Sequence, residues 1–403
     1  MTSDAGGLEE LLSPLSLDEF LALHWECEPL HVKGKTAAIR RLIDVGEIEE
    51  LIAYHGRSGQ PPFSTSSRGP VGPRHTREPL GEARRAHAAG ETIFVPEIHL
   101  RWPRFAAFCR ALELRFRHPV GATLVFGPAG AQGLTPHFDA AAVFALQVSG
   151  RKTWHVARPI RELPVFGDPL TDLSAMPEPN VSYELEPGDM LYVPMGFPHV
   201  AHSGCEPSLH VSVYVNSIRA RDVVAKVLAQ AVESDVAFRR PLVPGLLGSA
   251  GGDAALATIL TDLLARLAER IDPAAAHAAL MADLLGQMQP LPSGRYAWEK
   301  APITADTQVQ RAPGVLAFAS RGATGAVLAY PGGHTRGPIH IFESFAFIAA
   351  TERFRISELP GLDAAGQLVL VERLLVEGVL LPDQSYDAAR AATPLHATLV
   401  PSV

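Results

Sequence analysis

Residues 119–215 are divided into short runs that are rich in β-branched and aromatic residues and are bounded by glycine and proline. Such runs are typical of β-strands joined by tight turns. Many short strands in succession predict a β-sandwich or a β-barrel. The expected strands are 123–126, 143–148, 152–156, 182–185, 190–193 and 209–215.

Three side chains in this region form a candidate metal-ligand set. His137 and Asp139 are one residue apart, so on an extended segment both project from the same face. His199 follows a Pro-Gly-Asp turn and a short strand, and we expect it at the mouth of a sheet. Two imidazoles and one carboxylate bind Fe(II) on one face and leave the other positions open. Another divalent metal remains an alternative, because affinity alone does not select iron.

Composition narrows the class of protein. A chain of 403 residues is too long for one typical core, so we expect two or three domains. A formal net charge of −8 argues against a general nucleic-acid binder. The three cysteines are widely spaced, which favours reduced thiols in the cytoplasm over a disulfide framework or a zinc site. We also expect no signal peptide and no membrane span, because no apolar run is long enough.

The regions on either side of the strands differ in character. Residues 10–55 predict short helices, and Ser16 with Glu19 has capping-box spacing. Residues 56–90 are rich in glycine, proline, serine and arginine, which predicts either a solvated surface loop or a basic flap along a substrate groove. Residues 217–290 predict Ala/Leu-rich helices whose apolar faces must be buried.

Several segments resemble one known family. They are Leu12–Val32, Gly90–His99, Ala122–His137 and the segment from His137 to His155, which contains Lys152 and Trp154. Together with the His-x-Asp and His199 pattern, they resemble the JmjC-type 2-oxoglutarate oxygenases, and within these the ribosomal-oxygenase group. The resemblance is close over about residues 10–216 and looser beyond. It implies an α+β protein built on a double-stranded β-helix, the jelly roll of cupins and JmjC domains.

The resemblance also implies cofactors and site residues. His137, Asp139 and His199 would bind Fe(II), and 2-oxoglutarate and O2 would be cosubstrates. Lys152 is in register with the basic residue that anchors the far carboxylate of 2-oxoglutarate; a lysine there has the charge of an arginine without its bidentate fork. Three further side chains are candidates for contacts with cosubstrate or substrate: His210 and Ser212, which share one face of the last expected strand, and Thr123.

Three domains are expected from these patterns. Residues 1–216 would form the catalytic domain, 217–295 a helical homodimerisation region and 296–403 a winged-helix-like domain. The last region predicts strands at 315–318, 325–330 and 339–342, and helices at 343–350 and 364–377. The helix at 364–377 carries two glutamates and one arginine, so we expect protein packing here and no DNA binding.

The function expected from the resemblance is hydroxylation of a protein side chain, an arginine or a histidine, in a ribosomal protein. A tailoring hydroxylase that acts on a precursor peptide in natural-product biosynthesis would use the same core and remains an alternative. A non-catalytic cupin that only binds a ligand is a third reading. The intact triad together with Lys152 argues against this third reading.

Overall fold

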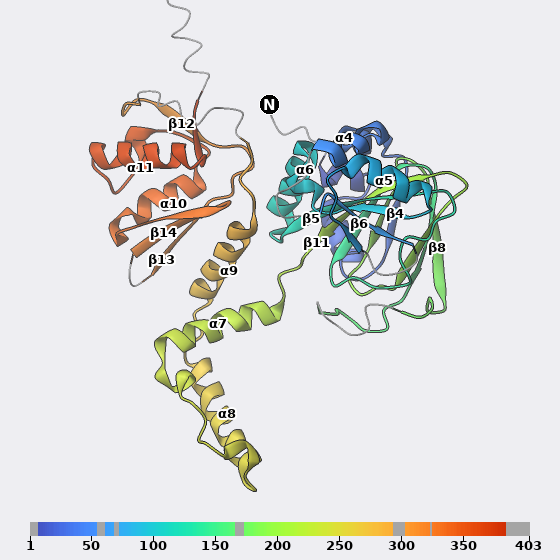
Figure 1. Cartoon of the computed structure of the whole chain (residues 1–403). Helices are drawn as coiled ribbons and strands as arrows, with labels where there is room; N and C mark the ends of the chain where they lie inside the picture. The colour runs from blue at the N-terminus through green and yellow to red at the C-terminus, as the bar shows by residue number, and fades with distance from the viewer. Residues whose placement is uncertain are drawn as a thin grey trace, which may run out of the picture. The chain divides into compact units, whose positions relative to one another are not determined.

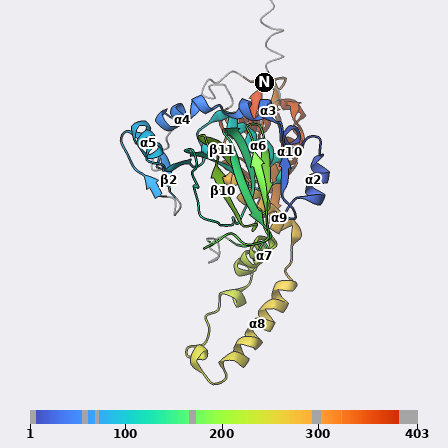
Figure 2. The same cartoon turned by 90° about the vertical axis from the view of Figure 1, so that its right-hand side faces the viewer.

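The structure is a computed structural model, and it describes residues 7–54, 61–67, 72–165, 173–292, 303–322 and 325–383. The chain forms two compact units, residues 1–217 and 218–403 (Figures 1 and 2). The first unit contains the expected strands. The second contains the expected helices of 217–290 together with the mixed region that follows them.

Two facing antiparallel sheets make up the jelly roll of the first unit. The large sheet has the strand order β1-β9-β6-β11-β5-β4-β2-β3 and the small sheet the order β10-β7-β8. In sequence order the strands of the large sheet are β1 (Leu30–Val32), β2 (Phe63–Ser66), β3 (Gly72–Arg74), β4 (Thr92–Val95), β5 (Val120–Gly127), β6 (Ala142–Ser149), β9 (Met190–Val193) and β11 (Ser208–Val215). Those of the small sheet are β7 (Lys152–Ala157), β8 (Asn180–Leu185) and β10 (His199–Ser203).

The alternation of residues along β11 divides the core of this unit into two parts. Val211, Val213 and Val215 are fully buried in the larger core cluster. The opposite face of β11 carries His210, Ser212 and Tyr214, which line a cavity. A smaller apolar cluster joins the two sheets and includes Trp154 of β7. One face of the large sheet thus packs in the main core, and its other face is left for a site.

Helices complete the larger core. They are α1 (Leu8–Leu12), α2 (Leu17–Leu23), α3 (Thr36–Leu42), α4 (Ile48–Tyr54), α5 (Pro79–Ala88) and α6 (Pro103–Phe116). The capping box expected at the start of α2 is present, because the Glu19 amide donates to Ser16 Oγ and the Ser16 amide donates to Glu19 Oε2. α6 has Pro103 at its first position, where a missing N–H has no cost.

The expectation of a long loop over residues 56–90 is wrong for most of its described part. β2 and β3 lie in this range and extend the large sheet, and α5 follows them. Three of the arginines in this range are paired with acidic groups: Arg74 contacts Glu91 at 2.6 Å, Arg84 contacts Glu49 at 2.6 Å, and Arg85 contacts Glu82 at 3.1 Å. Residues 56–60 and 68–71 lie outside the described residues.

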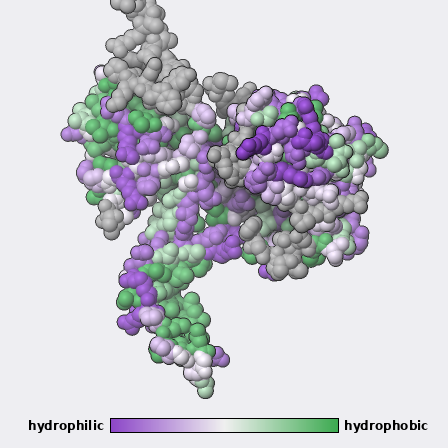
Figure 3. Space-filling model, viewed as in Figure 1, coloured by the Kyte–Doolittle hydropathy of each residue, from purple (hydrophilic) through white to green (hydrophobic). Residues whose placement is uncertain are grey.

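Three helices begin the second unit: α7 (Ala220–Ser234), α8 (Gly252–Ala268) and α9 (Pro273–Gln287). Lys226 of α7 forms an ion pair with Asp283 of α9. Of the 17 residues of α8, Gly252 is the only buried one, and apolar side chains gather along its surface (Figure 3). The helix therefore presents leucines to its surroundings.

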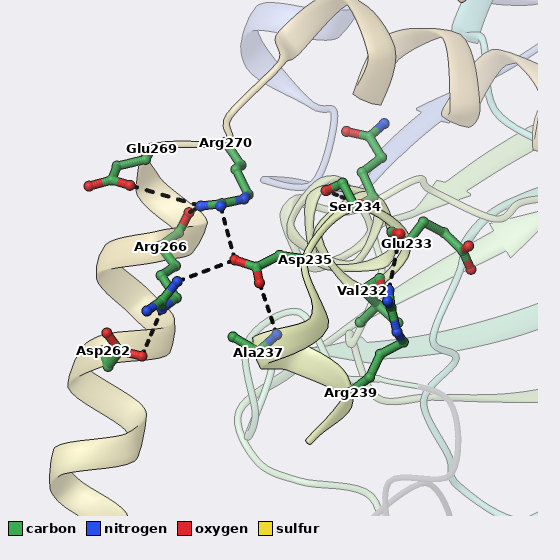
Figure 4. Close-up of polar contacts among 11 residues, drawn as sticks. Val232, Glu233, Ser234, Asp235, Ala237, Arg239, Asp262, Arg266, Glu269 and Arg270 are labelled. Carbon is green, nitrogen blue, oxygen red and sulfur yellow. Dashed lines mark hydrogen bonds and ion pairs between the residues drawn. The ribbon is translucent and has the colours of Figure 1, made fainter. Parts of the chain in front are cut away.

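An ion cluster ties the end of α7 to the end of α8. Asp235 follows α7, and its carboxylate lies 2.9 Å from an Arg270 nitrogen and 3.6 Å from an Arg266 nitrogen (Figure 4). The same carboxylate accepts a hydrogen bond from the Ala237 amide at 2.9 Å. Asp262, one turn before Arg266, pairs with it at 2.8 Å. These contacts join the segment that follows α7 to the C-terminal end of α8.

The rest of the second unit combines two small sheets with two helices. One sheet has the order β16-β12-β17 and the other β13-β14-β15. The elements are β12 (Gln308–Arg311), β13 (Phe318–Gly322), β14 (Gly325–Tyr330), β15 (Gly333–Gly337), α10 (Phe342–Ala350), β16 (Arg353–Arg355), α11 (Ala364–Val376) and β17 (Leu380–Pro382). Both expected helices are present. The expected strand at 339–342 is wrong, because Ile339–Ile341 form a turn of 3-10 helix that leads into α10.

Candidate metal centre

A pair of backbone hydrogen bonds brings the two histidines of the expected triad together. The His137 amide donates to the His199 carbonyl at 3.1 Å, and the His199 amide donates back at 2.7 Å. His199 is the first residue of β10, whereas His137 lies in an isolated bridge before β6. Their ring centroids are 4.4 Å apart. This bridge, with a second one between Gln132 and His202, joins two segments that are far apart in the chain.

The geometry of the triad fits a divalent metal. One ligand atom from each of His137, Asp139 and His199 lies within 4.8 Å of the others. His137 Nδ1 contacts the Thr135 carbonyl at 2.8 Å, and His199 Nδ1 contacts the Phe197 carbonyl at 3.0 Å. A carbonyl accepts only from a protonated nitrogen, so each Nδ1 donates and each Nε2 keeps its lone pair. Both imidazoles are thus held in the form that coordinates a metal.

Electrostatics favour the same protonation state. Burial lowers the pKa of His199 to about 4, and repulsion from His137 adds to the shift while Asp139 opposes it. A neutral imidazole is the metal-binding form. At neutral pH the His199 imidazole is therefore uncharged, and a metal that binds to it displaces no proton.

Lys152 lies at the start of β7, in the same cavity, and is 4% exposed. Gly150 makes the turn before it with a φ of +66°, a conformation that favours glycine. Lys152 Nζ lies 3.3 Å from His210 Nδ1, and no ion pair joins it to a carboxylate of the described residues. Burial lowers the pKa of Lys152 to about 8. A buried ammonium without a counter-ion is costly, and a carboxylate ligand would supply the missing partner.

One cavity of about 400 Å³ contains the triad and the other residues expected at the site. Thr123, Lys152, His210 and Ser212 all line it, together with His137, Asp139 and His199. The cavity has a metal end, formed by the triad, and a Lys152 end, where His210 contacts Lys152. The Trp154 ring lies near both ends: its centroid is 5.6 Å from that of the His199 ring and 5.4 Å from that of the His210 ring. Its indole nitrogen is buried and has no hydrogen-bond partner among the described residues. The metal end and the Lys152 end of the cavity are therefore neighbours.

Other lining residues were not among the expected site residues. Tyr214 and Asn216 continue the alternation of His210 and Ser212 along the β11 segment, so the two-residue period carried the signal for both. Phe94 of β4 and Leu134 also line the cavity. Leu134 lies three residues before His137 and so comes with the ligand, whereas Phe94 is brought to the site by the pairing of β4 with β5.

The family described as "JmjC domain" matches residues 100–223, which contain the triad and Lys152. The chain is similar to proteins named as ribosomal oxygenases. It is 30% identical over 254 residues to Ribosomal oxygenase 1 of Rattus norvegicus, a match over 58% of this chain and 42% of the relative. It is 38% identical over 131 residues to the "Bifunctional lysine-specific demethylase and histidyl-hydroxylase NO66" of Dictyostelium discoideum, over 31% of this chain and 25% of the relative. The chain thus spans less than half the length of these relatives.

Solved structures match the fold over a much larger share of the chain. YcfD, a ribosomal oxygenase from Escherichia coli, is 19% identical with a TM-score of 0.55, over 92% of this chain and 98% of YcfD. The complex of YcfD with cobalt and 2-oxoglutarate matches with a TM-score of 0.55, 18% identity and coverage of 91% and 98%. At this identity the likeness concerns the fold. No helix in the described ranges is long and apolar enough to cross a membrane.

Proposed function

We propose that the protein is an Fe(II)- and 2-oxoglutarate-dependent dioxygenase that hydroxylates an arginine or histidine side chain of a ribosomal protein. The observation that carries the proposal is the position of Lys152. Its buried ammonium group shares one cavity with a metal-ligand triad, and none of the described carboxylates forms an ion pair with it. A dicarboxylate cosubstrate provides a metal-binding end and a distant carboxylate for this cation.

The comparisons support this proposal. Two relatives are called Ribosomal oxygenase 1 and histidyl-hydroxylase, and the structure of YcfD was solved with cobalt and 2-oxoglutarate. Cobalt is a divalent metal that occupies sites of the same nitrogen and oxygen ligands as iron. The chain and YcfD share a fold over nearly the full length of YcfD.

Each residue of the cavity has a role in the proposed reaction. His137, Asp139 and His199 would hold Fe(II), and Lys152 would bind the far carboxylate of 2-oxoglutarate. The bound metal supplies the activation of O2 that couples decarboxylation of 2-oxoglutarate to hydroxylation of the substrate. Trp154, which is 4% exposed, limits the access of water to the space between the two ends. Ser212 and Thr123 offer hydroxyl groups to cosubstrate or substrate.

Mass spectrometry of ribosomal proteins tests the function. Ribosomes are compared from cells with the protein, without it, and with the matched variant Asp139→Ala. A hydroxylation that appears only with the intact protein supports the proposal. An unmodified ribosome, with modification of a short precursor peptide instead, would favour the tailoring hydroxylase. A protein that forms no succinate from 2-oxoglutarate under any condition would be a binding module.

A homodimer formed through residues 217–290 is part of the proposal. Apolar residues of this region are more than half exposed, among them Val224, Val236, Leu260 and Leu264. Contiguous apolar surface of this kind usually marks an interface. Leu260 and Leu264, the two exposed leucines of α8, are four residues apart and so lie on one face of the helix, as a helix-packing contact requires.

The region 296–403 is proposed as a winged-helix-like domain that packs against protein. Its α11 buries Leu370, Val371 and Leu374 in its own core. The exposed face carries Val369 and Val376, and Arg373 pairs with Glu377 at 3.3 Å. Such a face offers little to phosphates or base edges.

We also propose that the protein works in the cytoplasm, where it would act on ribosomal proteins without contact to DNA or a membrane.

A further inference from the structure

We propose that His210 is a positioning residue, whose imidazole accepts a hydrogen bond from the Lys152 ammonium group and holds this group, in its charged form, for the far carboxylate of the cosubstrate. The inference rests on the proposed oxygenase function and concerns how the same site keeps its cation. It follows from a buried contact between β7 and β11, from the turn that brings these strands together, and from the charges of the two side chains.

The contact between Lys152 and His210 joins the two sheets at one end of the cavity. Lys152 Nζ lies 3.3 Å from His210 Nδ1, and each residue is 4% exposed. An ammonium group has three N–H donors and no acceptor, so Nδ1 of His210 accepts and its Nε2 carries the proton. The Trp154 ring packs against the same imidazole, with ring centroids 5.4 Å apart and an interplanar angle of 83°. The imidazole is therefore held on two sides.

The turn before β7 brings the start of this strand to the start of β11. A Cβ atom at Gly150 would lie 2.1 Å from the backbone carbonyl oxygen of the residue before β11, so the turn can pack there only as glycine. Gln147 is fully buried, and its Nε2 contacts the Gly150 carbonyl and Ser208 Oγ, each at 2.9 Å. Lys152 and His210 each follow one of these anchored residues by two positions. Their contact is thus set by the backbone of two strands.

The positive charge of the pair lies on Lys152. Burial lowers the pKa of Lys152 to about 8, so at neutral pH the lysine is largely protonated. Burial, together with repulsion from Lys152 and His199, lowers the pKa of His210 well below its ordinary value, so the imidazole is neutral. The other titratable groups on the described cavity wall are the metal triad and Tyr214, whose pKa is raised by burial to about 12.

A neutral acceptor suits a cation that must bind a carboxylate. A hydrogen bond to the charged form of a buried group favours that form, so His210 opposes the effect of burial on Lys152. A carboxylate at position 210 would neutralise the ammonium group and leave less charge for a ligand. The imidazole stabilises the charge without cancelling it. Loss of the Nδ1 acceptor should therefore make Lys152 lose its proton at a lower pH.

NMR titration of the metal-free full chain tests the contact directly. The lysine side chains are labelled with 13C, and the Lys152 signal is identified by its absence from Lys152→Arg. His210→Leu and His210→Ala both remove the acceptor. In each we expect the pKa of Lys152 to fall by about one to two pH units, as for the loss of a hydrogen bond to a charged group. His210→Asn places a carbonyl oxygen near the position of Nδ1 and should restore most of this loss.

Cosubstrate binding tests the role in the proposed reaction. Affinity for 2-oxoglutarate is measured by calorimetry at pH 6 and pH 7.5, on Fe(II)-loaded protein without oxygen. Compared with the unchanged protein, His210→Leu should bind about three- to twentyfold more weakly at pH 7.5 and within about twofold at pH 6, where Lys152 regains its proton. A purely structural role would weaken binding at both pH values. In a protein that already has Lys152→Arg, the same exchange should have little effect, because a guanidinium keeps its proton.

His155→Leu is the matched control, because His155 lies on the other face of β7 and contacts Ser182; the pKa of Lys152 and the affinity should stay unchanged. An unaltered pKa of Lys152 in the variants without an acceptor, or one that His210→Asn does not restore, overturns the proposal. Equal weakening of binding at both pH values also overturns it. An unchanged protein that binds no 2-oxoglutarate contradicts the oxygenase function, and the titration of the metal-free protein then still decides whether His210 holds the charge of Lys152.

Discussion

Lys152 links cosubstrate binding to pH. Burial lowers its pKa to about 8, and a paired carboxylate requires the protonated form. Below that pH the lysine is already charged, so the affinity for 2-oxoglutarate should be constant. Above it, binding must take up a proton, and the affinity should fall about tenfold for each pH unit. Calorimetric titration without oxygen between pH 7 and 10 measures this profile. A flat profile for the unchanged protein would remove Lys152 as the anchor.

Substitutions of Lys152 give a second prediction. Lys152→Ala should raise the apparent KM for 2-oxoglutarate by an order of magnitude or more, because a charge-assisted pair in a desolvated site contributes about 1.5–3 kcal/mol. Lys152→Arg keeps a charge that does not titrate, so it should retain part of the activity and lose the pH dependence. Arg151→Ala is the matched control, because Arg151 is exposed and pairs with Glu186. An unchanged KM in Lys152→Ala contradicts the assignment.

The metal ligands give a third prediction. His137→Ala and Asp139→Ala should each lower bound Fe(II) below one per chain and reduce succinate formation to background, about a hundredfold or more. The melting temperature should change little, because both side chains are only partly buried. His155→Ala is the control, since His155 lies in β7 outside the cavity and contacts Ser182 at 2.9 Å. Normal succinate formation in both triad variants would exclude this metal site.

Most of the candidate site could be predicted from the sequence because its signals are local. His137 and Asp139 are separated by one residue, and Lys152 follows a glycine turn. The backbone bridge between His137 and His199 could not be predicted, because it joins segments far apart in the chain. Phe94 is likewise placed by the pairing of β4 with β5, and no pattern within its own segment indicates a cavity.

At the scale of the element, the pairing of β11 with β5 gives a fourth prediction. Gly121→Ala should lower stability by about 1–3 kcal/mol, because the new methyl group overlaps the Tyr214 ring. In a protein that already has Tyr214→Ala, the ring is absent, so adding Gly121→Ala should lower stability much less than it does in the unchanged protein. Gly286→Ala in α9 is the control: its Cβ meets nothing within 4 Å, and alanine favours a helix. Chemical denaturation measures all four variants, and additive effects at 121 and 214 would contradict the contact.

β2 shows why one element escaped prediction. Its sequence is Phe63-Ser-Thr-Ser66, without alternation, yet all four residues are buried. Thr65 accepts a hydrogen bond from Arg74 Nε at 2.9 Å, and β2 pairs with β4 and β3 on its two sides. The polar groups of β2 can be buried because the two neighbouring strands and the Arg74 side chain supply hydrogen-bond partners. The buried residues of β2 therefore show no apolar periodicity. Composition alone therefore indicated a loop.

At the scale of the whole molecule, apolar periodicity correctly indicated helices over 217–290. The same periodicity predicted that each helix buries an apolar face, but in α8 Gly252 is the only buried residue. Leu260 is 57% exposed and Leu264 is 56% exposed. The Asp235 cluster holds the C-terminal end of α8 by ion pairs with Arg266 and Arg270 (Figure 4). A second copy of the chain is the partner we propose for these leucines.

Assembly gives the fifth prediction. The unchanged protein should be a dimer in light scattering, and the double variant Leu260→Asp with Leu264→Asp should be a monomer, because two charges in an apolar helix contact are not compensated. The first unit contains every residue of the cavity, so the monomer should still form succinate. Val369→Asp is the matched control, since Val369 is 67% exposed on α11 and should not affect the dimer. A monomeric unchanged protein, or a variant that remains dimeric, would show that the leucine face of α8 is not the interface.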